Sequence, residues 1–284
     1  MSNGRTALVL GGGGITGIAW EIGVVTGLAD AGVDLRTADL VVGTSAGSVV
    51  GTQLRSALDV HELFDQQLAP PVETGPPAAM GRGLVLRFGL AVLRHRKHEQ
   101  AFRAQVGRLA LQAEAAGKTP TEQQRRDVIT ARLPSVSWPD RPLTLTAVDA
   151  ETGAFETFTR DSGVDLVSAV AASCAVPGVY PPVTIGVRRF VDGGMRSVAN
   201  VDLATGYDRI VVLAPITRGI GPMTSVDAQV TGLVSRVAVV SPDAGSRAAI
   251  GKNVLDPAAR AASARAGRAQ AAAEVDRVRE AWTG

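Results

Sequence analysis

The sequence predicts an α/β fold in which helices flank a central, mostly parallel sheet. The first observation is that an apolar segment, a glycine-containing turn and a helix-like segment follow one another twice within residues 7–58. This order is typical of parallel βα units. The second observation is a set of further short apolar segments, which supply the remaining strands at 143–148, 154–159, 189–191, 210–214 and 237–240. The third is length, because 284 residues can bury a full core.

The composition limits both the core and the partners. Hydrophobic residues make up 45% of the chain and aromatic residues 4%, so the core must consist mainly of Ala, Val, Leu and Ile. The formal net charge of +2 is too small to indicate a nucleic-acid partner. The single cysteine, Cys174, excludes an intrachain disulfide and favours a reducing compartment, so we expect a cytoplasmic protein. The Cys174 side chain itself is expected to be a small buried hydrophobe.

No segment is expected to direct secretion or to cross a membrane. Arg5 is followed by glycines, where a signal peptide would need an apolar block. The uncharged segment 166–187 is long enough for a membrane span, but Pro177, Pro181 and Pro182 break it.

The first two βα units account for residues 7–58. Residues 7–10 predict a short buried strand that ends at a run of glycines, and apolar residues recur at helical spacing over 15–29. Residues 40–42 predict a second buried strand, and 46–58 a second helix. A glycine turn therefore joins strand to helix in both units.

The remaining elements follow a proline-rich break at 69–79. A basic region comes next, then a polar, helix-like stretch to about residue 132. The strand at 143–148 forms a hairpin with 154–159, and 165–173 is a helix of small residues. The tail, 257–282, is an Ala-rich helix with a candidate interruption at Gly267. We expect one domain over residues 1–284, with a proline-flanked basic insertion at about 70–140.

The first glycine turn, "LVLGGGGITG" at 8–17, has two interpretations. Gly12-x-Gly14-x-x-Gly17 satisfies the dinucleotide-binding pattern between a strand and a helix. That pattern also needs an acidic residue at the end of the second strand, where this chain has Gly43-Thr44-Ser45. In the alternative, consecutive glycine amides at a helix N-terminus hold an oxyanion that forms during acyl transfer. The choice depends on whether a nucleophile stands beside the loop.

The second glycine turn, Gly43-Thr44-Ser45-Ala46-Gly47, matches the G-x-S-x-G nucleophile elbow. Its glycines permit a sharp turn from strand to helix, and the turn exposes the serine at the carboxyl end of the strand. The alternative is that Ser45 only caps the helix that follows.

Histidine is the weaker candidate for the base of this serine on sequence order, although His61 or His98 could fold back onto the elbow. The three histidines are His61, His95 and His98, and none lies beyond residue 98, which disfavours the order Ser, acid, His of α/β-hydrolases. We expect all three to be ordinary solvated residues.

A carboxylate can replace histidine as the base. Asp192 follows a predicted strand and precedes Gly193 and Gly194, where the chain turns sharply. The alternative is a plain Asp-Gly turn. Asp149 is a rival base, but its place at a hairpin corner favours turn chemistry.

Taken together, "GGGGITG", "GTSAG" and "DGG", with "AASCAVPGVYPP" before the last, resemble the patatin-like phospholipases. The tail "GKNVLDPAARAASARAGRAQ" resembles the closing segment of that family, whereas residues 60–140 contain no motif that we recognise. The resemblance implies a three-layer α/β architecture and hydrolysis of lipid acyl esters by a Ser–Asp dyad, with no cofactor or metal. It implies Ser45 as nucleophile, Asp192 as base and Gly12, Gly13 and Gly14 as the oxyanion loop, supported by Gly17, Gly43, Gly47, Gly193 and Gly194.

One position departs from the family pattern. Thr16 stands where the family has a basic residue that supports the oxyanion loop. The loop is then left with backbone amides and the helix dipole alone. We therefore expect a serine esterase or lipid acyl hydrolase. The alternatives are a catalytically weak lipid-binding or regulatory relative, and a nucleotide-binding α/β protein.

The basic insertion contains an apolar stretch with a cationic end, "LVLRFGLAVLRHRKH" at 84–98. If it is helical, one stripe carries Arg87, Arg94 and His98, and another carries Leu86, Leu90 and Leu93. This pattern suits a lid or a surface element in peripheral contact with an anionic membrane. The alternative is a core helix with a solvated edge.

Overall fold

The computed structural model describes residues 4–70 and 82–283, and over these residues it has a single eight-stranded sheet with the order β5-β6-β3-β2-β1-β7-β8. Five neighbouring strands run parallel: β3 (Leu143–Asp149), β2 (Leu40–Gly43), β1 (Thr6–Leu10), β7 (Arg209–Leu213) and β8 (Arg236–Val240). The antiparallel strands are β4 (Phe155–Phe158), which pairs with β3, and β6 (Arg188–Asp192) and β5 (Val183–Ile185). The predicted α/β fold with a mostly parallel sheet is confirmed.

Both faces of the sheet are covered, which explains why its strands are continuous apolar runs. Side chains alternate along a strand, so Leu8 and Leu10 of β1 enter one core while Ala7 and Val9 enter the other. The larger core packs under α1 (Gly14–Asp30), α2 (Ala46–Leu54), α3 (Val60–Leu68), α7 (Leu166–Ser173), α9 (Ala244–Ile250) and α10 (Arg260–Thr283). The opposite core lies under η4 (Val201–Ala204) and α8 (Val226–Thr231). η3 (Gly193–Met195) directly follows β6. The remaining short helices are η1 (Leu35–Thr37), η2 (Arg160–Ser162) and η5 (Pro257–Ala259).

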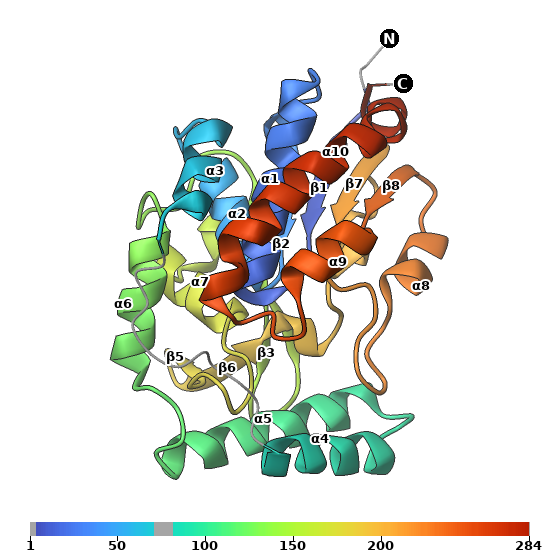
Figure 1. Ribbon diagram of the computed structural model, residues 1–284. Helices are drawn as coiled ribbons and strands as arrows, with labels where there is room; N and C mark the ends of the chain where they lie inside the picture. The colour runs from blue at the N-terminus through green and yellow to red at the C-terminus, as the bar shows by residue number, and fades with distance from the viewer. Residues whose placement is uncertain (1–3, 71–81, 284) are drawn as a thin grey trace.

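α10 packs closely against α1 (Figure 1). α10 continues without a break through Gly267, so the predicted interruption at Gly267 is wrong. A Cβ atom on Gly267 would lie 2.4 Å from the Trp20 carbonyl oxygen of α1. From the other side, a Cβ on Gly23 would lie 2.1 Å from the Ala264 carbonyl oxygen. These glycines let the two helix backbones approach closely, and this contact outweighs the helix-weakening tendency of glycine.

Two further boundaries differ from the prediction. α2 ends at Leu54 rather than at residue 58, because α3 begins shortly afterwards with a capping box formed by Asp59 and Glu62. The polar stretch before residue 132 consists of two helices, α5 (Glu99–Ala115) and α6 (Glu122–Arg132), and Thr121 caps the second.

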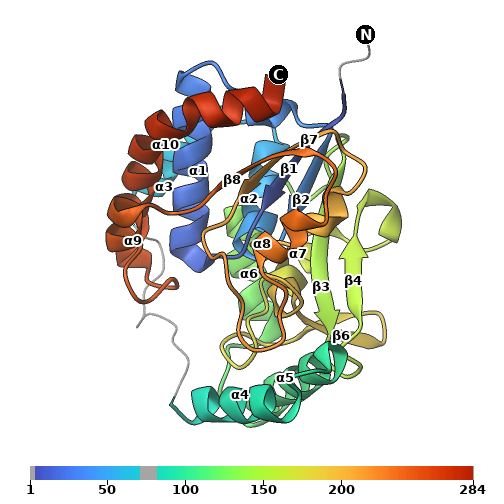
Figure 2. The same ribbon diagram turned by 90° about the vertical axis from the view of Figure 1, so that its right-hand side faces the viewer.

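The basic insertion places α4 (Arg82–Arg94) and α5 together beyond the carboxyl ends of the parallel strands (Figures 1 and 2). α4 ends at Arg94 and His98 is the N-cap residue of α5, so the expected stripe of Arg87, Arg94 and His98 does not exist. The proline-rich break at 69–79 falls outside the described residues except at its first two positions. Within the described part of the chain, no helix has both the length and the apolar character needed to span a membrane.

Glu21 is an unpaired acid inside α1. It is fully buried, and neither carboxylate oxygen has a hydrogen-bond donor among residues 4–70 and 82–283. Burial raises the pKa of Glu21 well above its ordinary value of 4.5, and the nearby Gly11 amide opposes this shift only in part. The folded chain therefore keeps the Glu21 proton to a higher pH than the unfolded chain does.

Glu21→Gln is expected to raise the free energy of unfolding at neutral pH and to flatten its decline with rising pH. Above pH 4.5 the unfolded chain releases this proton while the folded chain retains it, so wild-type stability falls as the pH rises toward the folded-state pKa. Urea unfolding from pH 5 to 8 measures both effects, with the exposed Glu280→Gln as the control. Parallel pH curves for wild type and Glu21→Gln would contradict this account of Glu21.

Candidate active site

Ser45 lies at the turn between β2 and α2, in a backbone conformation that few side chains adopt. Its φ of 52° and ψ of −115° are unusual for a residue other than glycine, and such strain is typical of nucleophile elbows. The turn is packed too closely for side chains on either side. A Cβ on Gly43 would lie 2.6 Å from the Gly47 carbonyl oxygen, and a Cβ on Gly47 would lie 2.1 Å from the Leu10 carbonyl oxygen.

The Ser45 side chain faces Asp192 and does not cap α2. Ser45 Oγ donates to Asp192 Oδ2 at 2.7 Å, and the side chain makes no capping hydrogen bond to the helix. The interpretation of Ser45 as a helix cap is therefore wrong. The two residues are brought together by strand pairing, because β2 pairs with β3 and β3 pairs with β6, which ends at Asp192.

Asp192 is both a turn residue and the hydrogen-bond partner of Ser45. Its Oδ1 accepts from the Gly194 amide at 2.7 Å, which closes the Asp-Gly turn. Gly193 must be a glycine, because a Cβ there would lie 2.2 Å from Thr146 Oγ1. The turn and the Ser45 contact therefore use different oxygens of one carboxylate.

Burial alters the proton affinity of Asp192. Its side chain is 3% exposed, and this desolvation raises the pKa of Asp192 to about 6, although hydrogen bonds from Ser45 and Gly194 and the charge of Arg125 favour the ionised form. A carboxylate with this pKa is mainly ionised at pH 7 but holds a proton more strongly than an ordinary aspartate. Both properties suit a general base.

The glycine loop supplies backbone donors beside Ser45. The Gly12 amide already donates to the Val198 carbonyl at 2.7 Å, whereas the Gly13 and Gly14 amides have no acceptor within the described residues. All three glycines line the same cavity as Ser45, and α1 begins at Gly14. The amides open to a ligand at this helix N-terminus are thus those of Gly13 and Gly14.

Thr16 anchors a distant segment over the loop. Its amide donates to the Val254 carbonyl at 3.1 Å, and its Oγ1 donates to the same oxygen at 3.3 Å. Gly14, with φ of +62°, also lies next to the Val254 carbonyl oxygen, because a Cβ on Gly14 would be 2.5 Å from it. The threonine therefore supports the loop through a backbone contact, with no charge. Neither motifs nor periodicity indicated that residues 252–255 would reach this site.

The cavity at Ser45 has a volume of about 510 Å³, within the range of small-molecule sites. Its walls are mostly apolar: Val176, Val179, Met195, Val198, Ile216, Ile220, Met223, Val254 and Leu255. The charged lining residues are Asp192, Arg218 and Lys252. The arrangement offers a nucleophile, an adjacent base and two backbone donors at one end of a largely apolar chamber.

The other candidate bases lie elsewhere. His61 is exposed and bridges Asp30 and Asp59, and these contacts raise its pKa. His98 is also exposed, His95 is half-buried, and none of the three lines the Ser45 cavity.

Asp149 accepts from the Glu151 and Thr152 amides and pairs with Arg188, as turn chemistry predicts. Cys174 is buried as expected, with Sγ donating to the Ser45 carbonyl at 3.1 Å.

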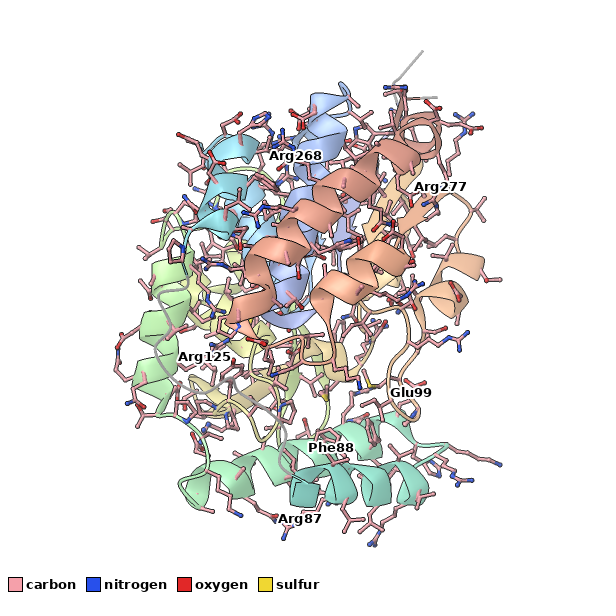
Figure 3. All side chains as sticks on the ribbon, viewed as in Figure 1. Arg87, Phe88, Glu99, Arg125, Arg268 and Arg277 are labelled. Atoms are coloured by element: carbon pink, nitrogen blue, oxygen red, sulfur yellow. The ribbon has the colours of Figure 1, made fainter. Side chains whose placement is uncertain are left out.

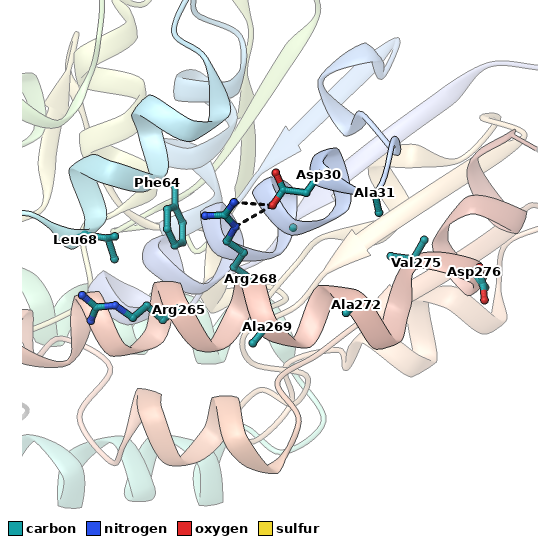
Figure 4. A pocket seen from close by; sticks show the side chains of 11 residues that line it. Asp30, Ala31, Phe64, Leu68, Arg265, Arg268, Ala269, Ala272, Val275 and Asp276 are labelled. Atoms are coloured by element: carbon teal, nitrogen blue, oxygen red, sulfur yellow. Dashed lines mark hydrogen bonds and ion pairs between the residues drawn. The ribbon is translucent and has the colours of Figure 1, made fainter.

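A larger hollow of about 810 Å³ lies between α1, α3 and α10, where Arg268 pairs with Asp30 and contacts Phe64 (Figure 4). Residues near the C-terminal end of α1 line this hollow, whereas the Ser45 cavity lies at the N-terminal end of α1. The 17 residues of α1 separate the two by roughly 25 Å. Among the described residues, no serine or cysteine lines this hollow, so it offers no hydroxyl or thiol of that kind for acyl transfer.

The sequence of residues 8–205 matches the patatin-like phospholipase family. Among solved structures, VipD from Legionella pneumophila is similar at 14% identity and a TM-score of 0.48, over 96% of this chain and 67% of that chain. The type III effector protein ExoU is similar at 16% identity and a TM-score of 0.42, over 100% of this chain and 57% of that chain. The chain thus spans about two thirds of the length of VipD and just over half of the length of ExoU. No curated protein matches the sequence.

Proposed function

Because the chain belongs to the patatin-like phospholipase family, we propose that it is a serine acyl hydrolase that cleaves carboxylic esters of lipids. The observation that carries this proposal is the 2.7 Å hydrogen bond from Ser45 Oγ to Asp192 Oδ2 inside a mostly apolar cavity. The apolar walls suit an acyl chain, and the open amides of Gly13 and Gly14 suit the oxyanion of an ester.

The proposed reaction has two halves. Ser45 Oγ attacks the ester carbonyl carbon while Asp192 takes the hydroxyl proton, and the Gly13 and Gly14 amides stabilise the oxyanion. When the tetrahedral intermediate collapses, the C–O bond to the alcohol breaks and the protonated Asp192 returns the proton to the leaving oxygen. Water then attacks the acyl-Ser45 while Asp192 takes a proton from the water. The C–O bond to Ser45 breaks, Asp192 returns the proton to Ser45 Oγ, and the acid product leaves.

Covalent labelling tests the nucleophile. A fluorophosphonate probe is expected to modify Ser45 alone, which peptide mapping by mass spectrometry would show, and Ser45→Ala should abolish both labelling and turnover of p-nitrophenyl esters. Ser48, one turn further along α2, is the matched control: it is fully buried, and Ser48→Ala should still be labelled. A folded wild-type protein that resists the probe would instead indicate a catalytically weak lipid-binding relative.

We also propose that α4 rests on an anionic lipid surface. Leu86, Leu90 and Leu93 are 66%, 57% and 58% exposed, so the alternative of a core helix does not apply to this stripe. Phe88 is buried in a cluster against which the cavity-wall residue Met195 packs. In Figure 3 Phe88 lies on the inner side of α4 while Arg87 points away from the molecule. A lipid surface on the outer side would therefore lie close to the cavity.

The charge of this segment complements anionic lipid. Its exposed cations are Arg87, Arg94, Arg96 and Lys97, and no acidic residue occurs between positions 83 and 98. Exposed leucines flanked by cations are typical of helices that lie in the membrane interface.

Arg94→Gln/Lys97→Gln is expected to weaken flotation with vesicles rich in phosphatidylglycerol. Each cation near such a surface contributes about 1 kcal/mol, so partitioning should fall roughly thirtyfold. Added salt should weaken wild-type binding in the same direction. Arg236→Gln/Arg265→Gln removes the same charge from exposed positions in β8 and α10, and serves as the control. If both double variants float equally well, α4 is an ordinary solvated helix.

A further inference from the structure

We infer that Arg218 and Lys252 bind the anionic phosphate of a lipid head group at the Ser45 cavity, and so select anionic over zwitterionic lipid esters. This inference rests on the proposed function, because it names the preferred substrate of the same site. Apart from Asp192, Arg218 and Lys252 are the charged residues that line the cavity, and both are exposed.

Within the described part of the chain, neither cation has a carboxylate partner. Several arginines of the fold form ion pairs with carboxylates, such as Arg188 with Asp149 and Arg196 with Asp202. Arg218 and Lys252 make no ion pair or side-chain hydrogen bond with any residue in 4–70 or 82–283. The only acidic residue in the cavity lining is Asp192, which is 3% exposed and bonded to Ser45. The two positive charges are therefore available to a ligand.

The two cations come from separate loops, and each loop is held by a contact near the cation. The loop of Arg218 packs on α4, since a Cβ on Gly221 would lie 2.7 Å from a Val92 methyl carbon. The loop of Lys252 is anchored two residues further on, where Thr16 holds the Val254 carbonyl. Both loops thus contact another element close to the cation, and both cations line the cavity that holds Ser45.

The cavity has an apolar region and a cationic region, which suit different parts of an ester substrate. With the ester carbonyl at Ser45, the apolar walls accept the acyl chain, and the remaining polar part of the substrate is left to the region of Arg218 and Lys252. A guanidinium binds a phosphate through two parallel hydrogen bonds, and an ammonium adds a point charge. A zwitterionic head group brings its own ammonium beside these cations, so its binding should gain less.

The test compares substrates that are monomeric in solution, which removes any contribution from α4 and a membrane surface. We expect wild type to prefer dihexanoyl-phosphatidylglycerol over dihexanoyl-phosphatidylcholine in kcat/KM. In Arg218→Gln/Lys252→Gln this preference should fall roughly tenfold, mainly through KM, as expected for loss of hydrogen bonds to a charged group. The control Arg236→Gln/Arg265→Gln should keep the preference. An unchanged preference in the cavity variant would overturn the inference.

A binding experiment separates this inference from the proposed catalysis. Ser45→Ala should bind dihexanoyl-phosphatidylglycerol by calorimetry, and adding Arg218→Gln/Lys252→Gln should weaken that binding roughly tenfold. Such a loss supports head-group recognition even if wild type proves to hydrolyse nothing. Inorganic phosphate should bind far more weakly than the lipid. Equal binding of inorganic phosphate would assign the cations to a free-phosphate site and overturn the role in lipid selection.

Discussion

Asp192→Asn is expected to lower kcat for p-nitrophenyl butyrate hydrolysis by roughly two to four orders of magnitude, the usual contribution of general-base assistance. Asparagine preserves the shape of the side chain and a hydrogen bond to Ser45 Oγ, which lies 2.7 Å from Asp192 Oδ2 in the wild type, but it cannot accept the proton. Because burial raises the pKa of Asp192 to about 6, wild-type kcat/KM should fall as the pH drops below that value. The residual kcat/KM of Asp192→Asn should show no such decrease at low pH.

Stability and the histidines provide the controls for this variant. A buried carboxylate with a raised pKa lowers stability once it is ionised, so Asp192→Asn should unfold at the wild-type temperature or above it at pH 7. The triple variant His61→Gln/His95→Gln/His98→Gln should retain most of the esterase rate, since no histidine lines the cavity. A histidine variant as slow as Asp192→Asn, with an unchanged circular dichroism spectrum, would disprove the dyad.

Gly13→Ala is expected to reduce kcat by roughly two to three orders of magnitude, the range for loss of an oxyanion donor. A Cβ on Gly13 would lie 2.5 Å from Pro215 Cβ and 2.8 Å from the Gly17 Cα. Either the proline or the loop must therefore shift, and the Gly13 amide would lose its direction toward the ester oxygen. Initial rates with p-nitrophenyl butyrate, together with the melting temperature, measure the effect.

Gly12→Ala is the matched control for the glycine loop. Its Cβ would make ordinary contacts, 3.5 Å from the Val198 carbonyl oxygen and 3.6 Å from Ser45 Cβ, and its amide already donates to Val198. We expect less than a tenth of the kcat loss seen for Gly13→Ala. Similar losses in both variants would mean that the loop acts through its overall shape rather than through particular amides.

The sequence by itself determined the order of the parallel βα units and the three motifs. Buried parallel strands are short apolar runs, and a strand-to-helix turn as sharp as the one at Ser45 admits only glycine at positions 43 and 47, so both leave a local mark on the sequence. The three-residue strand β5 and the short helices α8 and α9 were missed, because segments of that length carry too little periodicity.

Only the tertiary structure decided which groups within those motifs are free to act. The sequence treated Gly12, Gly13 and Gly14 alike, but the Gly12 amide is bonded to Val198, a residue far along the chain. Thr16 looked like the loss of a charge, but it holds the Val254 carbonyl. Such pairings depend on segments that are distant in sequence, so no local pattern records them.

The insertion shows the same division. Its periodicity predicted a helix with an apolar stripe, and α4 is that helix. Periodicity shows which side chains share a face of the helix, but it does not show which face packs against the core. In the fold Phe88 and Ala91 cluster with Phe102, Val106 and Leu109 of α5, and Met195 and Met223 pack against this cluster. The leucines are left outside. The exposed face of α4 was therefore set by α5 and by two methionines more than a hundred positions away, because a helix buries whichever side the rest of the chain covers.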